Sequence, residues 1–150
     1  MTSGSFERQF ETLRTAEECW AVLTDVDRMA GWVGIVGQVI TRTPLVAYGA
    51  SLEDRMGPFR LRADLDIRVT EREVPARIRF RASGQDRQVG SRLTVDAGMQ
   101  LVPNAGRTIV RFDGTYSVEG RVATLGGPMI RHKADAILDQ FLSRAEEELR

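Results

Sequence analysis

Apolar and polar residues alternate along the central part of the chain, from residue 59 to residue 119. Four segments within this part each place a row of apolar residues at every second position, a pattern typical of strands with one buried face. They cover residues 59–70, 76–83, 91–101 and 108–119. Short turn sequences that contain Pro, Gly, Asn or Asp separate them. The pattern predicts an antiparallel meander with one face in water and the other face covered.

Additional strands are expected on the N-terminal side of this meander. Leu45–Met56 precedes the turn Gly57-Pro58 and predicts one strand, and Gly37–Thr41 predicts another. Phe6–Leu13 is a less regular strand candidate. The chain therefore carries about seven strands.

Two helical regions are expected to cover the apolar face. Thr15 and Glu18 have the spacing of a capping box, and the short helix that they open has a buried stripe. That stripe consists of Ala16, Cys19, Trp20 and Leu23. Asp27 is expected to cap a second short turn through Met29 and Trp32. After Gly120 the apolar period becomes helical, and Pro128 predicts a kink or restart near the beginning of this long C-terminal helix.

This order of elements predicts an α+β fold in which a curved antiparallel sheet of about seven strands grips the C-terminal helix. The single domain is expected to span residues 1–150. Such a grip tends to leave an apolar cavity between helix and sheet, which is a natural place for a ligand.

Composition and charge narrow the classes of function. The 150 residues carry 21 basic and 21 acidic side chains, and this balance argues against nucleic acid or an anionic membrane surface as a partner. No apolar stretch is long enough for a membrane span. Cys19 and His132 are each the only residue of their type, so we expect no intramolecular disulfide and no zinc cluster. A reduced, cytoplasmic setting without a metal or cofactor is the resulting expectation.

Several short motifs resemble the START/Bet v-type helix-grip (SRPBCC) superfamily and, within it, the G-type accessory protein family of carbon monoxide dehydrogenase. The resemblance spans nearly the whole chain and is carried by Glu18–Asp25, Gly57-Pro58-Phe59, Glu73-Val74-Pro75, Gly90-Ser91, Leu101-Val102-Pro103 and Gly120–Gly126. The last of these is the most diagnostic for the subfamily. The resemblance implies a non-enzymatic accessory protein of a molybdenum hydroxylase such as carbon monoxide dehydrogenase, which binds a quinone- or lipid-like molecule. Any membrane association would then be peripheral and through a partner.

Seven residues are candidates to line the ligand cavity. They are Trp32, Tyr48, Asp54, Phe80, Met99, Tyr116 and Met129. Flexible methionines suit ligands of irregular shape, although each apolar candidate could equally be part of the core. Asp54 has two open interpretations, because an inward carboxylate needs a partner or a raised pKa, whereas an irregular strand end would let it reach solvent.

Two other functions remain open. The first is an enzyme of the polyketide cyclase/dehydratase kind that uses Asp54 and Tyr116. The second is a protein-interaction module whose outer sheet face carries arginines, since residues 60–92 contain nine arginines and five acidic residues.

Overall fold

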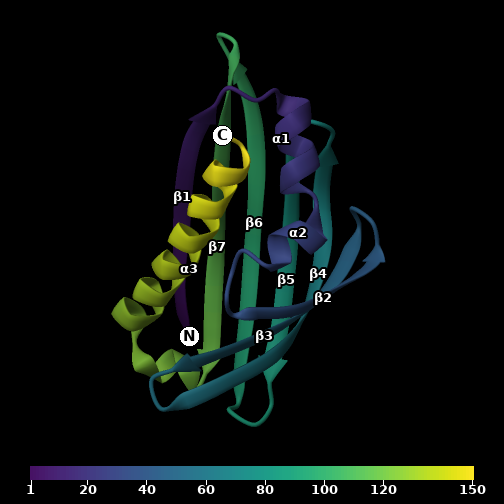
Figure 1. Cartoon of the computed structure of the whole chain (residues 1–150). Coiled ribbons are helices and arrows are strands. Elements are labelled where there is room, and N and C mark those ends of the chain that lie inside the picture. The colour runs from purple at the N-terminus through teal and green to yellow at the C-terminus, as the bar shows by residue number, and fades with distance from the viewer.

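The computed structural model describes residues 1–150, and its seven strands form one antiparallel sheet in the order β1-β7-β6-β5-β4-β3-β2 (Figure 1). The strands are β1 (Thr2–Thr12), β2 (Val36–Thr43), β3 (Ala47–Met56), β4 (Phe59–Glu73), β5 (Arg77–Asp86), β6 (Ser91–Asn104) and β7 (Arg107–Gly120). The predicted meander corresponds to β4–β7, in which each strand pairs with the next. The chain returns at its N-terminus to place β1 against β7.

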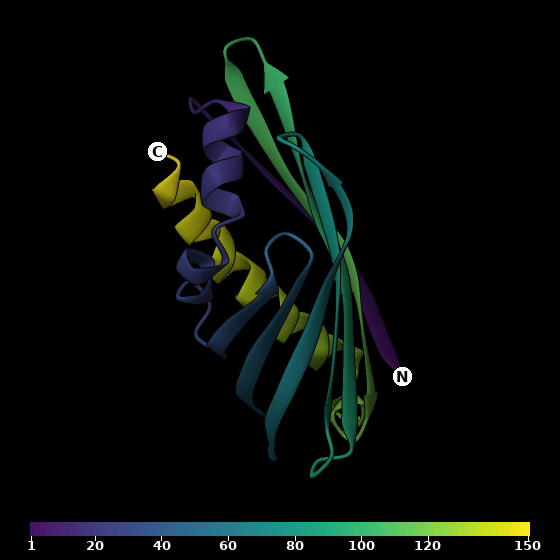
Figure 2. The same cartoon turned by 90° about the vertical axis from the view of Figure 1, so that its right-hand side faces the viewer.

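The helices lie together on one side of the curved sheet (Figure 2). They are α1 (Ala16–Leu23), α2 (Val26–Ala30), the short 3-10 helix η1 (Val122–Leu125) and α3 (Gly127–Glu148). The long helix α3 runs along the concave face, and its C-terminal end lies beside α1 (Figures 1 and 2). This arrangement confirms the predicted helix-grip fold.

Alternation along the strands decides which face the helices cover. On β4, for example, Leu61 and Ala63 are buried while Arg62 and Asp64 are exposed. We call the face with the apolar rows the inner face and the opposite face the outer face. The inner face is the one that packs against the helices, as the alternation predicted.

The local signals at helix ends are largely confirmed. The Thr15 hydroxyl accepts the backbone N–H of Glu18 at 3.1 Å, as a capping box requires. The chain restarts at Gly126, whose φ of 93° ends η1, and Pro128 lies in the first turn of α3.

Three expected boundaries are wrong in detail. Asp25, not Asp27, caps α2, because its carboxylate is the one that accepts the N–H of Arg28. The strand predicted from Leu45 begins at Ala47, because Leu45 has a φ of 58° in the turn between β2 and β3. The first strand begins at Thr2 rather than Phe6, since the small residues before Phe6 continue the pairing with β7.

Candidate functional site

The apolar interior is divided into two buried clusters. One cluster, which we call the closed end, surrounds α1 and the C-terminal part of α3. It comprises Cys19, Trp20, Leu23, Trp32, Met99, Leu101, Val110, Ala145 and Leu149. The other cluster surrounds η1 and the first turns of α3, and comprises Leu52, Leu61, Tyr116, Val118, Val122 and Ile130. Two of the candidate cavity residues, Trp32 and Met99, are thus only 2% and 4% exposed within the closed end.

Aromatic rings add to the packing of the closed end. Trp32 packs against Phe141 of α3 with ring centroids 5.5 Å apart, and Phe141 meets Phe112 of β7 edge-on at 5.3 Å. Phe112 in turn lies 6.4 Å from Phe10 of β1. This row of rings joins the loop after α2, the long helix and two strands, so it fixes the spacing of helix and sheet at this end.

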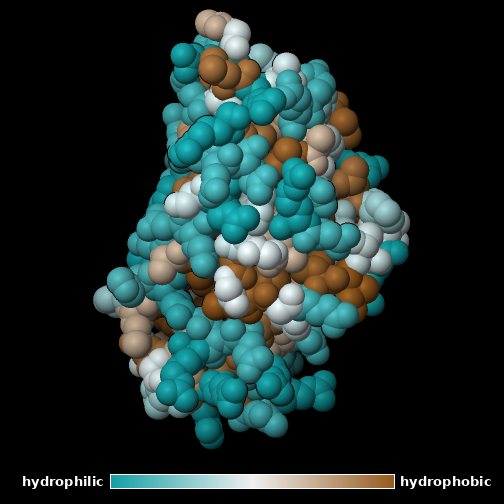
Figure 3. Space-filling view, viewed as in Figure 1, coloured by the Kyte–Doolittle hydropathy of each residue, from teal (hydrophilic) through white to brown (hydrophobic).

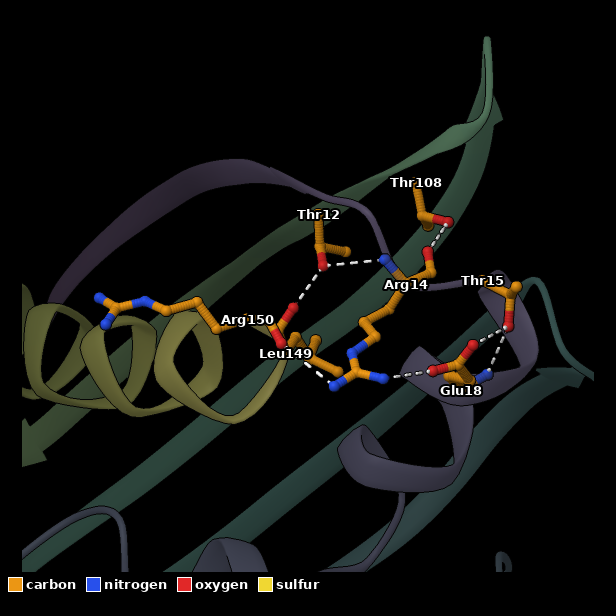
Figure 4. Close-up of polar contacts among 7 residues, drawn as sticks. All are labelled: Thr12, Arg14, Thr15, Glu18, Thr108, Leu149 and Arg150. Carbon is orange, nitrogen blue, oxygen red and sulfur yellow. Dashed lines mark hydrogen bonds and ion pairs between the residues drawn. The ribbon is translucent and has the colours of Figure 1, made fainter.

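A polar network secures the same end (Figure 4). The Thr12 hydroxyl donates to the carbonyl oxygen of Leu149 and accepts the backbone N–H of Arg14. The Arg14 guanidinium bonds the carbonyl oxygen of Arg150 at 3.2 Å and pairs with Glu18 at 3.0 Å. The last turn of α3, whose carbonyl groups lack partners within the helix, is thereby tied to the junction of β1 and α1.

The middle of the inner face is packed differently. Ile67, Val69 and Phe80 point toward the helices but are only half-buried, and they belong to neither cluster. Opposite them along α3, Ile137 and Leu138 are likewise half-buried and outside both clusters. We call these five residues the open middle. Their remaining exposure means that the helix does not close over the sheet there.

Small residues add to the space in this region. Across the sheet, Phe80 pairs with Ala97, which pairs with Gly114, and Ile67 pairs with Ala82. Hydrophobic surface crosses the middle of the face on which α3 lies (Figure 3). An apolar surface of this kind between helix and sheet has the chemistry of a site for a hydrophobic molecule.

Polar contacts bridge α3 to the strands on both of its flanks. On one flank, Asp135 pairs with Arg8 of β1 at 3.1 Å. On the other flank, Lys133 pairs with Asp54 of β3 at 3.0 Å, and the Gln140 side chain accepts the N–H of Gly34 at 3.2 Å. We call this second flank the seam.

The seam contains a hollow of about 420 Å³ lined by Gly34, Ile35, Glu53, Asp54, Arg55 and Arg60. We call it the seam hollow. It forms where β3 runs on past the beginning of β2, because the pairing of these strands ends at Val36 and Leu52. Ile35 lines the hollow and also packs against the cluster around η1, so the hollow adjoins the apolar interior.

Asp54 is neither on an irregular strand end nor in open solvent. Its strand pairs in regular register with β4, its side chain is only 12% exposed, and its carboxylate lies on Lys133. The sequence interpretation missed this partner by assigning the residues around His132 to a solvated helix face. A signal existed, since Lys133 lies three residues after Ile130 and four before Ile137, on the buried stripe of the helix. His132 itself is exposed.

The other polar candidates lie apart from one another. The hydroxyl of Tyr48 accepts the N–H of Leu45 at 2.7 Å and so serves the turn between β2 and β3. Tyr116 is buried in the cluster around η1 and its ring lies over Gly4 of β1. Its hydroxyl has no hydrogen-bond partner within the protein and is not fully closed off from water. Met129 is 45% exposed in the first turn of α3.

The lone cysteine behaves as the sequence predicted. Cys19 is fully buried in the closed end, and burial, with a smaller contribution from Glu18, raises the pKa of its thiol. The thiol is therefore in its protonated, unreactive form at neutral pH.

The outer face holds a second hollow, of about 510 Å³, lined mainly by the side chains of Ser3, Ser5, Arg81, Thr94, Asp96, Thr115 and Ser117. Arginines on this face are largely matched by acidic residues: Arg79 pairs with Asp113 at 3.0 Å and with Asp96 at 3.6 Å. The excess of arginine in the sequence therefore does not produce a continuous basic surface here.

Solved structures with the same fold have low sequence identity to this chain. A conserved protein from Geobacillus kaustophilus is 21% identical, with a TM-score of 0.81, and the match covers 98% of this chain and 94% of that one. A START superfamily protein from Mycobacterium smegmatis is 16% identical with a TM-score of 0.70, covering 95% and 94%. The di-domain ARO/CYC StfQ from the steffimycin biosynthetic pathway is 9% identical with a TM-score of 0.67, covering 99% of this chain and 51% of StfQ.

These likenesses establish the fold. No curated protein matches the chain by sequence. None of the helices combines the length and the apolar character needed to cross a membrane. At the level of sequence, the family described as "Polyketide cyclase / dehydrase and lipid transport" matches residues 3–150. This match spans nearly the whole chain, and the protein therefore belongs to the polyketide cyclase/dehydrase and lipid transport family.

Proposed function

We propose that the protein binds a hydrophobic small molecule between the sheet and α3, in contact with the open middle. The observation that carries the proposal is the contrast in burial along the inner face. Phe80 is half-buried although it points toward the helices, whereas Met99 and Val110 on the same face are buried. A bound apolar molecule would remove the remaining surface of Phe80 and its neighbours from water, at about 25 cal/mol per Å² of apolar surface.

Family membership supports the same class of function, because its description includes both cyclases and lipid transport. In the structure, no charged side chain other than Asp54 and Lys133 bridges the seam between α3 and β3, and these two neutralise each other. An uncharged apolar tail would then lie among Ile67, Phe80 and Ile137.

The direct test is a titration of the delipidated protein with the uncharged fluorescent probe N-phenylnaphthylamine. Saturable binding with enhanced fluorescence is the expected result. Extraction of the purified protein, followed by mass spectrometry, would identify any molecule that it carries from its host. Absence of saturable probe binding to folded protein would contradict the proposal.

A filled middle should abolish this binding. Ala82 lies on the inner face of β5 beside Phe80, and Ala82→Phe places a ring in the space proposed for the ligand. The matched control is Ser83→Phe, which adds a ring to the exposed outer face one residue further along. We expect a loss of affinity of at least about tenfold for the first variant, equivalent to about 1.4 kcal/mol, and none for the second.

The resemblance to the G-type accessory proteins of carbon monoxide dehydrogenase supports a narrower proposal, in which the bound molecule is quinone- or lipid-like and the protein serves a molybdenum hydroxylase. The test is co-purification of the tagged full chain from its host. Retention of a molybdenum hydroxylase would support this role. Its absence, with a bound ligand still present, would leave a carrier of another kind.

A cyclase or dehydratase is the second candidate, favoured by the hydroxyl of Tyr116, which has no partner within the protein. In this function the phenol would donate to a substrate oxygen and the Asp54 carboxylate, now paired with Lys133, would take up a proton. Tyr116→Phe and Asp54→Asn should then each abolish turnover of a polyketide substrate while probe binding persists. Turnover that survives both substitutions would exclude this chemistry.

A further inference from the structure

We propose that the seam hollow binds the anionic head group of an amphipathic ligand, a carboxylate or a phosphate, whose apolar tail occupies the open middle. This inference rests on the proposed function and adds a ligand class to it. Its basis is an arrangement of arginines at the seam that the protein leaves only partly neutralised.

Arg55 and Arg60 lie directly opposite each other on β3 and β4. Like charges at directly opposite positions of neighbouring strands destabilise a sheet. Both residues line the seam hollow, so an anion placed there would lie between two guanidinium groups. Arginine is well suited to this role, because its planar fork binds carboxylate and phosphate oxygens in pairs.

The carboxylates nearby are already engaged. Glu53 lies 3.5 Å from Arg60 and 3.2 Å from Arg62, so it is shared between two arginines. Asp54 is paired with Lys133, and its other oxygen accepts the N–H of Arg55. The Arg55 side chain has no ion-pair partner in the structure.

The strand layout explains why Arg55 has no partner. Strand β2 ends its pairing at Leu52, so beyond this residue β3 has a neighbour only on the β4 side. Arg68 and Arg81 are also an opposite pair, on β4 and β5, but each has a carboxylate within reach of its own strands. Arg68 pairs with Asp66 at 3.4 Å, and Arg81 lies opposite Asp96 of β6.

The hollow is also placed to receive one end of a ligand in the interior. Ile35 lines it and packs against the interior cluster, as do Met56 and Phe59 from the strands that carry the arginines. Lys133 of α3 lies on Asp54 at the same place. A molecule with its tail along α3 would therefore carry its polar end out beside Arg55.

The experiment compares ligands that share a tail and differ in the head group. Decanol, decanoate and decyl phosphate are each used to displace N-phenylnaphthylamine from the full chain at low salt and pH 8. Without an anion site, decanol should bind at least as well as the others, because its head is less strongly hydrated. We expect both anions, or one of them, to bind about three- to tenfold more tightly than decanol, and high salt to reduce the difference.

The variants locate the preference. Arg55→Gln combined with Arg60→Gln should remove the preference for the anions and leave the affinity for decanol unchanged. Arg81→Gln is the matched control, because it also removes an exposed strand arginine from an opposite arginine pair, and it should keep the preference.

The outcomes separate the two proposals. Equal affinity for all three ligands, or an equal loss in the Arg81 control, would overturn the anion site while the carrier function stands. Failure of the probe and of all three ligands to bind would overturn the carrier function itself. A preference for decyl phosphate alone would assign the site to phosphate heads, and a preference for decanoate alone to carboxylates.

Discussion

The closed end and the open middle are built on the same sheet and the same helix, yet they are packed to different degrees. At the closed end, Trp32 and Val110 are almost completely buried and the last turn of α3 is tied by Thr12. In the open middle, Phe80 and Ile137 keep part of their apolar surface exposed. The fold therefore obtains its stability at one end and leaves the centre of the grip for another molecule.

The largest expected contrast between the two regions is in unfolding free energy. Trp32→Ala should cost about 3–5 kcal/mol, because it removes a buried ring that packs against Phe141. Phe80→Ala should cost only about 1 kcal/mol in the ligand-free protein, since its ring is half-exposed. Urea denaturation of both variants measures the difference. Equal losses would show that the two regions are equally well packed.

Thiol reactivity sharpens the comparison without changing the core greatly. Cys19 should react with a disulfide reagent only when the protein opens, because it is fully buried and its thiol pKa is raised by burial. In a Cys19→Ala background, Phe80→Cys should react at least about a hundredfold faster, equivalent to about 2.7 kcal/mol in opening free energy. Similar rates for the two thiols would contradict an open middle. Saturation with a bound probe should slow the second thiol alone.

A buried carboxylate provides a test of the sheet end away from the closed end. Asp86 is 4% exposed and accepts backbone N–H groups from Arg62, Val89 and Gln88, which hold its pKa below the usual range. Asp86→Asn leaves the N–H of Arg62 without its acceptor and should cost about 2 kcal/mol at neutral pH.

The pH dependence of this loss has a definite sign. The folded-state pKa of Asp86 is lowered, so its contribution is complete above the usual carboxyl pKa and disappears as pH falls through the lowered value. The stability difference between wild type and Asp86→Asn should therefore shrink in acid. Denaturation series at neutral and acid pH measure it, and a constant difference would contradict this role of the ionised form.

The smallest of these effects concerns the polar tie at the end of α3. Thr12→Val keeps the shape of the side chain but leaves the Leu149 carbonyl and the Arg14 N–H without this partner, at a cost of about 1–2 kcal/mol. Thr115→Val is the control, because this exposed hydroxyl has no partner within the protein. If both variants were equally stable, the closed end would owe its order to packing alone. Probe affinity should remain unchanged in both.

The fold was predictable because strand alternation and helix caps are local signals. Residues 59–119 alternate so regularly that their inner face follows from the sequence, and Thr15 marks the start of α1 as the capping box requires. Asp25 and Asp27 could not be separated in this way, since both precede the same short helix and only the backbone direction decides which one caps it.

The contacts at the seam depend on tertiary structure. Lys133 and Asp54 are 79 positions apart, and their pairing follows from where α3 crosses the edge of the sheet. The missing partner of Arg55 depends on the point at which β2 stops pairing with β3, which no local pattern announces. Likewise, the Tyr48 hydroxyl lies in the turn that it stabilises because Leu45 adopts a left-handed backbone conformation.

The pairing of β1 with β7 has a consequence for the time course of synthesis. Thr12 bonds the carbonyl of Leu149, 137 positions later, and β1 has β7 as its only neighbour in the sheet. At about 5–20 residues per second, a ribosome needs about 7–27 s to add that length of chain. Throughout this interval β1, with Phe6 and Phe10, has no partner strand, so we expect the nascent chain to depend on chaperones most during those seconds.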